Sequence, residues 1–197
     1  RGNKIKSNAV VPADFNTLVR TSNQHKEMET LEILGTEHYA EYENFVENHP
    51  TGTILQSVDW HKVKDNWEHE VIVHRNAQGE IVAGVSVLIR KVPIFGVSLL
   101  YAPRGPVCDY SNPEHFKILQ QGIDQLAKQY KAYQFKIDPD VLISDKDFTK
   151  IMTDLGYVQE LGEGAFANIQ ARFNYRVYID GMSQEDILMN FHSKTRY

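Results

Sequence analysis

The sequence predicts a mixed α/β fold with a largely antiparallel sheet flanked by helices. Apolar residues alternate with other residues along 81–89 and again along 95–101, which is the period of half-buried strands. The turn-forming segment 76–79 separates the first of these strands from an apolar run at 71–74, which indicates a β-hairpin. From Pro113 to Lys131, apolar residues follow at three- and four-residue steps, the period of a helix that packs against a sheet. Strands that form a meander before one long helix favour this class over an all-helical or a parallel doubly wound fold.

Before the hairpin, the sequence predicts two helices behind a polar leader. Residues 1 to about 30 are polar and lack periodicity, so we interpret them as an arm. The segment Thr36–Asn48 carries its large apolar side chains at helical spacing and is followed by turn-forming residues. A second helix is predicted from a Ser57 cap through Trp67, with Val63 on its apolar face.

After the long helix, the pattern predicts further strands with a helix between them. A short strand is expected at 135–137 and a helix at 147–155. The segment 168–180 holds strict alternation over six apolar positions, which predicts a strand. Ser183 with Asp186 has the spacing of a capping box and predicts a last helix that continues to the final residue.

Composition limits the class of protein. The 197 residues suffice for one domain with a buried core and the start of a second. The longest apolar stretch, 81–89, is interrupted by Gly84 and Ser86 and is far shorter than the roughly 20 residues that span a bilayer. The first residues lack the pattern of a signal peptide. The net charge of −5 argues against binding nucleic acid through bulk charge but leaves room for a local basic site.

Common catalytic signatures are missing from the sequence. It contains neither a Walker phosphate loop nor a dinucleotide fingerprint, and its eight histidines show no paired metal spacing. The single cysteine, Cys108, cannot form an internal disulfide, which fits a reducing cytoplasm. A lone cysteine is more often structural than nucleophilic.

Three segments combine cations with turn or cap residues. Segment 56–64 is compatible with a ligand site or with an amphipathic helix whose lysines are solvated. Segment 101–110 contains two prolines and Arg104, which could bind a phosphate or carboxylate, or pair with Asp109 in a rigid turn. Segment 193–197 places cations at a helix end, where they favour the helix dipole without any further function.

Taken together, these segments resemble the Fem family of peptidoglycan bridge-forming aminoacyltransferases. The resemblance extends from about residue 32 to the last residue. The motifs that carry it are LQS at 55–57 followed by Trp60 and by VK at 63–64, PRGPV at 103–107, KIDP at 136–139 and KTRY at 194–197.

The resemblance implies a fold and an activity. Fem proteins consist of two domains similar to acyl-CoA N-acyltransferases (GNAT-like), with a substrate cleft between them. Residues 1–31 would then form a leader or arm, 32–165 a first GNAT-like domain, and 166–197 the start of a second. The family continues past this point, so the resemblance implies a truncated second domain, no identifiable catalytic residue in this chain and no activity of these residues alone. The implied reaction moves an amino acid from aminoacyl-tRNA to the stem peptide of UDP-MurNAc-pentapeptide or lipid II.

The resemblance also implies site residues and partners. Lys64 and Arg196 would clamp the diphosphate of the acceptor from two sides, and four further residues would shape the pocket. These are Tyr101, Arg104, Asp109 and Tyr197. No cofactor and no metal are implied. The implied location is cytoplasmic, and a lipid-linked acceptor leaves room for peripheral membrane contact.

Two other functions stay open at this point. A non-catalytic GNAT-like module could bind a nucleotide-linked ligand without turnover. An acetyl-CoA-dependent N-acyltransferase would need a glycine-rich pyrophosphate loop before the long helix, and residues 110–113 show no such loop.

Overall fold

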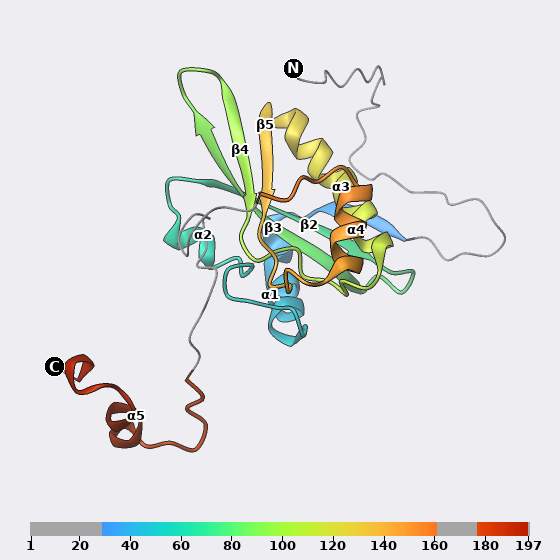
Figure 1. Ribbon diagram of the computed structural model, residues 1–197. Coiled ribbons are helices and arrows are strands. Elements are labelled where there is room, and N and C mark those ends of the chain that lie inside the picture. The colour runs from blue at the N-terminus through green and yellow to red at the C-terminus, as the bar shows by residue number, and fades with distance from the viewer. Residues whose placement is uncertain (1–28, 161–176, 197) are drawn as a thin grey trace. The chain divides into compact units, whose positions relative to one another are not determined.

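The computed structural model describes residues 29–160 and 177–196. The chain divides between Val158 and Gln159 into two compact units, each of which is described by itself (Figure 1). The described part of the first unit is a five-stranded sheet with helices on both faces.

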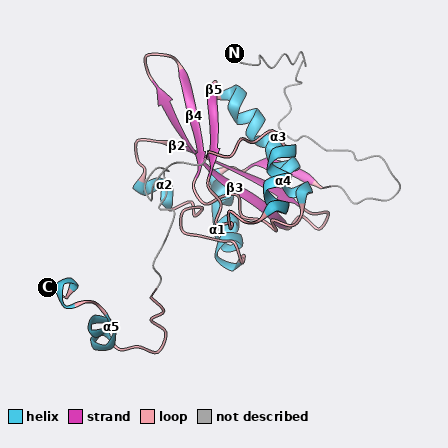
Figure 2. Cartoon of the chain, viewed as in Figure 1, coloured by secondary structure: helices cyan, strands magenta, loops and turns pink. Residues whose placement is uncertain are grey.

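The sheet has the strand order β1-β2-β3-β4-β5. The first four strands pair antiparallel, and β5 pairs parallel to β4 after a crossover through the long helix (Figure 2). Their bounds are β1 Thr30–Ile33, β2 Glu68–Arg75, β3 Ile81–Val92, β4 Val97–Ala102 and β5 Ala132–Ile137. This arrangement confirms the predicted mixed and largely antiparallel sheet.

Helices cover the two faces of the sheet unequally. On one face, α3 and α4 pack over a cluster that includes Ile72 and Leu100, whereas α1 packs over Val71 and Val73 on the other face. Side chains of consecutive strand residues point to opposite faces, so β2 contributes to both clusters. The helices of this unit are α1 Tyr39–Asn48 after a 3-10 turn at Thr36–His38, α2 Trp60–Val63, α3 Pro113–Gln129 and α4 Lys146–Asp154.

The first residue of β3 does not share a face of the sheet with the alternate apolar residues that follow it. A bulge between His74 and Arg75 shifts the register, so that Arg75 lies opposite Ile81 and His74 opposite Ala83. Ala83 and the following alternate residues pack with α3, whereas Ile81 packs with the α1 cluster. A bulge adds one residue to a strand and so changes the face that its neighbours occupy.

The second predicted helix is wrong in length. The structure contains only one helical turn, α2, and residues 64–66 form turns that lead into β2. Ser57 does not cap it, because its hydroxyl accepts a hydrogen bond from the amide of Asp59 in a tight local turn. Val63 is 66% exposed and therefore does not belong to a buried face.

Strand β1 was not predicted from the sequence. Its residues pair with β2 from Thr30↔Arg75 to Ile33↔Ile72. Leu31 is 5% exposed and packs in the α3 cluster. The strand lies at the edge of the sheet.

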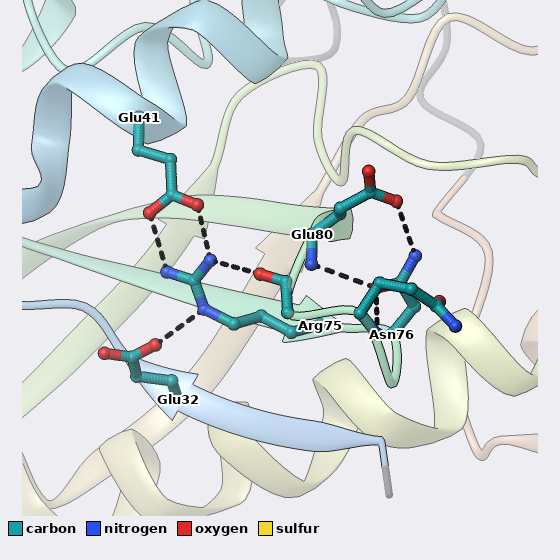
Figure 3. A network of polar contacts seen from close by, with 7 residues as sticks. Glu32, Glu41, Arg75, Asn76 and Glu80 are labelled. Carbon is teal, nitrogen blue, oxygen red and sulfur yellow. Dashed lines mark hydrogen bonds and ion pairs between the residues drawn. The ribbon is translucent and has the colours of Figure 1, made fainter. Parts of the chain in front are cut away.

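Arg75 connects three elements around this edge (Figure 3). Its guanidinium forms a bidentate pair with Glu41 of α1, at 2.5 and 2.8 Å, and Nε donates to Glu32 of β1 at 2.9 Å. It also donates to the carbonyl of Gly79 in the β2–β3 loop at 2.9 Å. The Arg75 side chain is only 15% exposed, and its charge is paired with two carboxylates, those of Glu32 and Glu41.

The described part of the second unit consists of two short helical segments. The helix α5, Gln184–Asn190, begins with the predicted capping box between Ser183 and Asp186. The prediction of one continuous helix is wrong, because Phe191 adopts an extended backbone and a 3-10 turn follows at Ser193–Thr195. Of the predicted strand, residues 168–176 lie outside the described part, and residues 177–179 are irregular.

No helix in residues 29–160 or 177–196 is both long enough and apolar enough to cross a membrane.

Candidate functional site

The candidate site is built where β3 and β4 separate. The two strands pair from Val92↔Val97 to Leu88↔Tyr101, and their ladder ends there. The chain then turns through residues 103–106 and returns to β3, where Val107 and Gly84 exchange two backbone hydrogen bonds of 2.8 and 2.9 Å. The segment 103–107, which carries the PRGPV motif, therefore spans a gap in the sheet.

The Gln56 side chain fills this gap. It is fully buried, its Oε1 accepts from the amide of Ser86 at 2.9 Å, and its Nε2 donates to the Ser86 carbonyl at 3.2 Å. The same Nε2 donates to the carbonyl of Pro103 at 2.9 Å. The amide of Gln56 thus replaces a peptide group of the missing strand neighbour and satisfies buried backbone groups of β3.

Gly105 is required by this arrangement. A Cβ at this position would lie 2.6 Å from Cδ of Gln56, which is closer than nonbonded carbon atoms approach. The preceding residue, Arg104, has a positive φ of 55°, which costs energy for a residue with a Cβ and is maintained only where the surroundings fix it.

Asp138 supplies that fixation and joins two of the predicted site residues. Its Oδ1 accepts from the backbone amide of Arg104 at 2.7 Å, and its Oδ2 accepts from the Tyr101 hydroxyl at 2.9 Å. The Arg104 guanidinium also donates to the Asp138 carbonyl, at 3.4 Å. Burial raises the pKa of the Asp138 carboxyl above its usual range, although these donors favour the carboxylate.

Asp138 is the site residue that sequence reasoning missed. It belongs to the KIDP motif at 136–139, but it was not predicted to be a site residue. Only the parallel pairing of β5 with β4 brings the end of one strand beside the end of the other. The KIDP motif was the signal in the sequence that could have identified Asp138 as a site residue.

The Asp109 side chain forms hydrogen bonds within its own turn. Its Oδ1 accepts from the amide and the hydroxyl of Ser111, at 2.9 and 2.7 Å, and the residue is exposed. These hydrogen bonds lower the pKa of the Asp109 carboxyl. The alternative in which Arg104 pairs with Asp109 in a rigid turn is therefore wrong. The residue that binds Arg104 is Asp138.

Lys64 follows directly on α2 and is exposed. Its ammonium lies 5.8 Å from the ring centroid of Trp60, a cation–π distance that orients the side chain without burying it. Lys62 of the same helix points to a different partner, because it forms an exposed ion pair with Asp59 at 2.6 Å.

Arg196 and Tyr197 belong to the second unit. The Arg196 guanidinium donates to the carbonyls of Met189 and Phe191, each at 2.8 Å, and contacts the Met189 sulfur at 3.5 Å. It therefore caps the carboxyl end of α5, where a cation also favours the helix dipole. Tyr197 lies outside the described residues. Lys64 belongs to the first unit and Arg196 to the second, and the clamp between them stays a prediction.

Histidines gather on the α1 face of the sheet, beside the gap. His69 stacks on His61 with ring centroids 4.7 Å apart, contacts Tyr39 edge-on, and lies 2.7 Å from the Ser86 hydroxyl through Nε2. Burial, and then the charge of His61, lower the pKa of His69 to about 4. His69 is therefore neutral at physiological pH and serves as a hydrogen-bond partner to β3.

Two further observations limit the chemistry of the described part. In residues 29–160 and 177–196, no group of three or more His, Cys, Asp or Glu side chains could hold a metal ion. Cys108 is fully buried, and burial, followed by the charge of Asp109, raises the pKa of its thiol to about 12. A thiol in this environment does not ionise at neutral pH, so Cys108 is structural.

Comparison with known proteins identifies sequence relatives over most of the chain. The FemAB family model matches residues 28–197. The UDP-N-acetylmuramoylpentapeptide-lysine N(6)-alanyltransferase of Weissella viridescens is 34% identical over 139 residues, 68% of this chain and 40% of that protein. The lipid II:glycine glycyltransferase of Staphylococcus aureus is 35% identical over 176 residues, 86% of this chain and 40% of that protein. The chain thus spans about 40% of the length of these relatives.

Solved structures agree with the fold. The crystal structure of FemX superposes with a TM-score of 0.57 at 33% identity, covering 64% of this chain and 31% of FemX. A probable acetyltransferase superposes with a TM-score of 0.52 at 8% identity, covering 74% of this chain and 99% of that one. At so low an identity the second match shows the fold alone, which is the predicted GNAT-like fold.

Proposed function

Because this chain belongs to the FemAB family, we propose that it is part of an aminoacyltransferase that builds the interpeptide bridges of peptidoglycan. The proposed acceptor is the stem peptide of UDP-MurNAc-pentapeptide or of lipid II, and the proposed donor is aminoacyl-tRNA. The family match over residues 28–197 carries this proposal. Two of its relatives, an alanyltransferase acting on a muramoylpentapeptide and a lipid II glycyltransferase, support the class of acceptor.

The proposed reaction is attack of a neutral amine on an activated ester. The amine nitrogen of the stem peptide bonds to the aminoacyl carbonyl carbon, the ester bond to the tRNA ribose breaks, and the ribose hydroxyl leaves with the proton that the nitrogen loses. Such a step depends mainly on positioning, worth up to roughly 7–11 kcal/mol in favourable cases, and on stabilising the developing oxyanion. It requires neither a metal nor an organic cofactor.

The proposed acceptor site uses the residues around the sheet gap. Arg104, whose backbone is held by Asp138, would bind an anionic group of the acceptor, with Tyr101 beside it. Asp109 and Tyr197 are further residues that would shape this pocket. The rigid backbone at residues 103–107 supports the proposal, because a preorganised cation loses little entropy on binding.

The proposed diphosphate clamp consists of Lys64 and Arg196. The exposed ammonium of Lys64, oriented by Trp60, supports its part. Arg196 has five N–H donors, and its contacts to Met189 and Phe191 use three of them. It would therefore bind a phosphate oxygen while still capping α5. We propose further that residues 166–197 begin a second GNAT-like domain, and that the protein acts in the cytoplasm, where charged tRNA is available.

A transfer assay tests the proposed function. The natural protein that carries this chain is incubated with tRNA charged with labelled glycine, alanine or serine, together with UDP-MurNAc-pentapeptide or lipid II. Label should pass to the stem peptide. Label that stays on tRNA with every pairing, or labelled acetyl-CoA that acylates the muropeptide instead, would contradict the proposal. Muropeptide binding without any transfer would favour the non-catalytic module.

Calorimetric titration of the muropeptide tests the clamp. We expect Lys64→Ala and Arg196→Ala each to weaken binding by about ten- to a hundredfold, since a charge-assisted contact in a cleft contributes about 1.5–3 kcal/mol. The effect should decrease at high salt. Lys62→Ala, on another side of α2, is the matched control and should bind as the wild type does. Equal muropeptide affinities in the wild type and all three variants would show that neither Lys64 nor Arg196 binds the diphosphate.

A further inference from the structure

The tip of the β3–β4 hairpin is an exposed apolar surface. Ile94 is 88% exposed and Phe95 is 74% exposed. All six residues from Val92 to Val97 have apolar side chains or none, in the sequence VPIFGV. Figure 1 shows this hairpin, in light green, projecting from the body of the sheet. Two large apolar side chains at the end of a projecting hairpin indicate an interaction surface.

The other hairpin of the same sheet provides a comparison within the molecule. Its loop, residues 76–79, has the sequence NAQG, and the Asn76 side chain closes it by accepting from the amides of Gln78 and Glu80. That loop satisfies the turn with polar groups, as turns facing water generally do. The β3–β4 turn instead closes with backbone bonds from Phe95 and Gly96 to the Val92 carbonyl. A turn therefore does not require apolar side chains at this position.

Cations are located immediately below the apolar tip. Arg90 and Lys91 are exposed and lie near the end of β3, just before the turn that carries Ile94. The Arg90 guanidinium lies 5.7 Å from the ring of Trp67, and the Lys91 ammonium pairs with Glu68 and lies 6.0 Å from the ring of Tyr130.

The start of β5 and the residue before it add an aromatic side chain and a third cation. The carbonyl of exposed Lys131 accepts from the Ser98 amide of β4 at 3.3 Å, which places this lysine beside the hairpin. Tyr133, 59% exposed, follows two residues later on β5. The hairpin thus has an apolar end, and the cations and aromatic rings lie together behind it.

We propose that this hairpin docks the protein on the surface of a membrane rich in anionic lipids. Strand residues rise about 3.3 Å each, so Arg90 and Lys91 lie roughly 10 Å from the tip. This length matches the roughly 5–10 Å to which interfacial apolar groups enter the boundary between headgroups and acyl chains. Ile94 and Phe95 would enter that boundary while the cations meet lipid phosphates, and Tyr133 would lie at headgroup level.

The chemistry of the tip favours lipid over other partners. A nucleic acid would be bound by hydrogen-bonding side chains and by aromatic stacking, but residues 92–97 carry no hydrogen-bonding side chain and only one aromatic ring. A protein partner would not require the cations to form a separate layer behind the apolar end. The inference goes beyond the proposed enzymatic function and does not depend on the acceptor, because it concerns the lipid bilayer itself.

Cosedimentation with vesicles tests the proposal. The full chain is mixed with vesicles of phosphatidylcholine alone, or of phosphatidylcholine with 30% phosphatidylglycerol, in the absence of muropeptide. We expect binding to the anionic vesicles and at least about tenfold weaker binding after the double change Ile94→Ser and Phe95→Ser. The change Lys91→Gln should reduce binding to anionic vesicles by about fivefold and leave binding to neutral ones unchanged.

The matched control removes another exposed apolar pair, elsewhere in the first unit. Leu142 and Ile143 are 78% and 57% exposed in the loop after β5. Because β5 runs parallel to β4, this loop lies at the end of the sheet opposite the hairpin tip. The double change Leu142→Ser and Ile143→Ser should leave vesicle binding unchanged. Both double variants should keep the wild-type melting temperature, since the altered side chains are exposed.

Several results would overturn the proposal. The wild-type chain could remain in the supernatant with every vesicle, or the tip variant could bind as the wild type does. Alternatively, the tip variant could lose self-association or tRNA binding while vesicle binding is unchanged, which would assign the tip to a second copy or to nucleic acid. Because the vesicles contain no muropeptide, failure of the transfer assay would leave tip-dependent vesicle binding intact.

Discussion

At the scale of single residues, Asp138 determines the geometry of the candidate site. It binds the Arg104 amide and the Tyr101 hydroxyl at once. We expect Asp138→Ala to lower the free energy of unfolding by about 2–3 kcal/mol, because two partly buried donors lose a charged acceptor. Tyr101→Phe removes the hydroxyl itself, so no donor is left without an acceptor. This change should lower the free energy of unfolding by only about 0.5–1.5 kcal/mol. Urea unfolding of both variants measures the difference, and equal costs would show that Asp138 does not hold the loop.

His69 provides a prediction on pH dependence. Its folded pKa of about 4 lies below the 6.5 of a free histidine, so the unfolded chain takes up a proton first as pH falls. Stability should therefore be complete above pH 6.5 and decrease between pH 6.5 and 4, by up to about 3 kcal/mol. His69→Gln should flatten this slope. NMR titration of the imidazole gives the midpoint directly, and a midpoint above 6 would refute the assignment.

At the scale of elements, the PRGPV segment is fixed by the contact between Gln56 and Gly105. Gly105→Ala would place a methyl group 2.6 Å from Cδ of Gln56, and Gln56→Ala would leave the Ser86 backbone groups unsatisfied. Each change should cost about 1–3 kcal/mol. The double variant should cost less than the sum, because removing the Gln56 side chain makes space for the new methyl group. A double-mutant cycle by denaturant unfolding measures this coupling, and strict additivity would contradict it.

The elements differ in how well the sequence predicted them. The long helix was predicted within two residues, because Pro113 at its first position and a strong apolar stripe are local signals. Strand β1 was missed, because its four residues are stabilised by pairing with β2, a contact far away in the chain. For the same reason the KIDP and PRGPV motifs could be recognised separately, whereas their meeting at Asp138 required the parallel pairing of β4 and β5.

At the scale of the whole first unit, Arg75 couples β1, α1 and the β2–β3 loop. The Arg75 hydrogen bonds lower the pKa of the Glu41 carboxyl. A lowered carboxyl pKa contributes stability above the unfolded value, and that contribution is lost as pH falls through the folded value. We expect Arg75→Gln to cost about 1–2 kcal/mol at pH 7, a value reduced for the 47% exposure of Glu41.

Comparison of two pH values tests this assignment. The difference in urea midpoint between wild type and Arg75→Gln should narrow from pH 7 to pH 3, since the wild type loses the charged partner. Lys150→Gln is the matched control, because Lys150 and Asp154 form an exposed helical pair and its loss should change stability by less than about 0.5 kcal/mol. A constant difference across this pH range would exclude the ion pair as the cause.

The edge position of β1 has a consequence for any shortened version of the protein. A chain that begins at Gly35, the residue before the first described helical turn, would retain all the helices described in residues 29–158 but leave β2 without β1. The hydrogen-bonding groups of β2 that now face β1 would be available to a strand of another molecule. Such a chain should form soluble oligomers or precipitate at concentrations where the longer chain stays monodisperse. Strand β1, which was not predicted from the sequence, would then protect β2 against self-assembly.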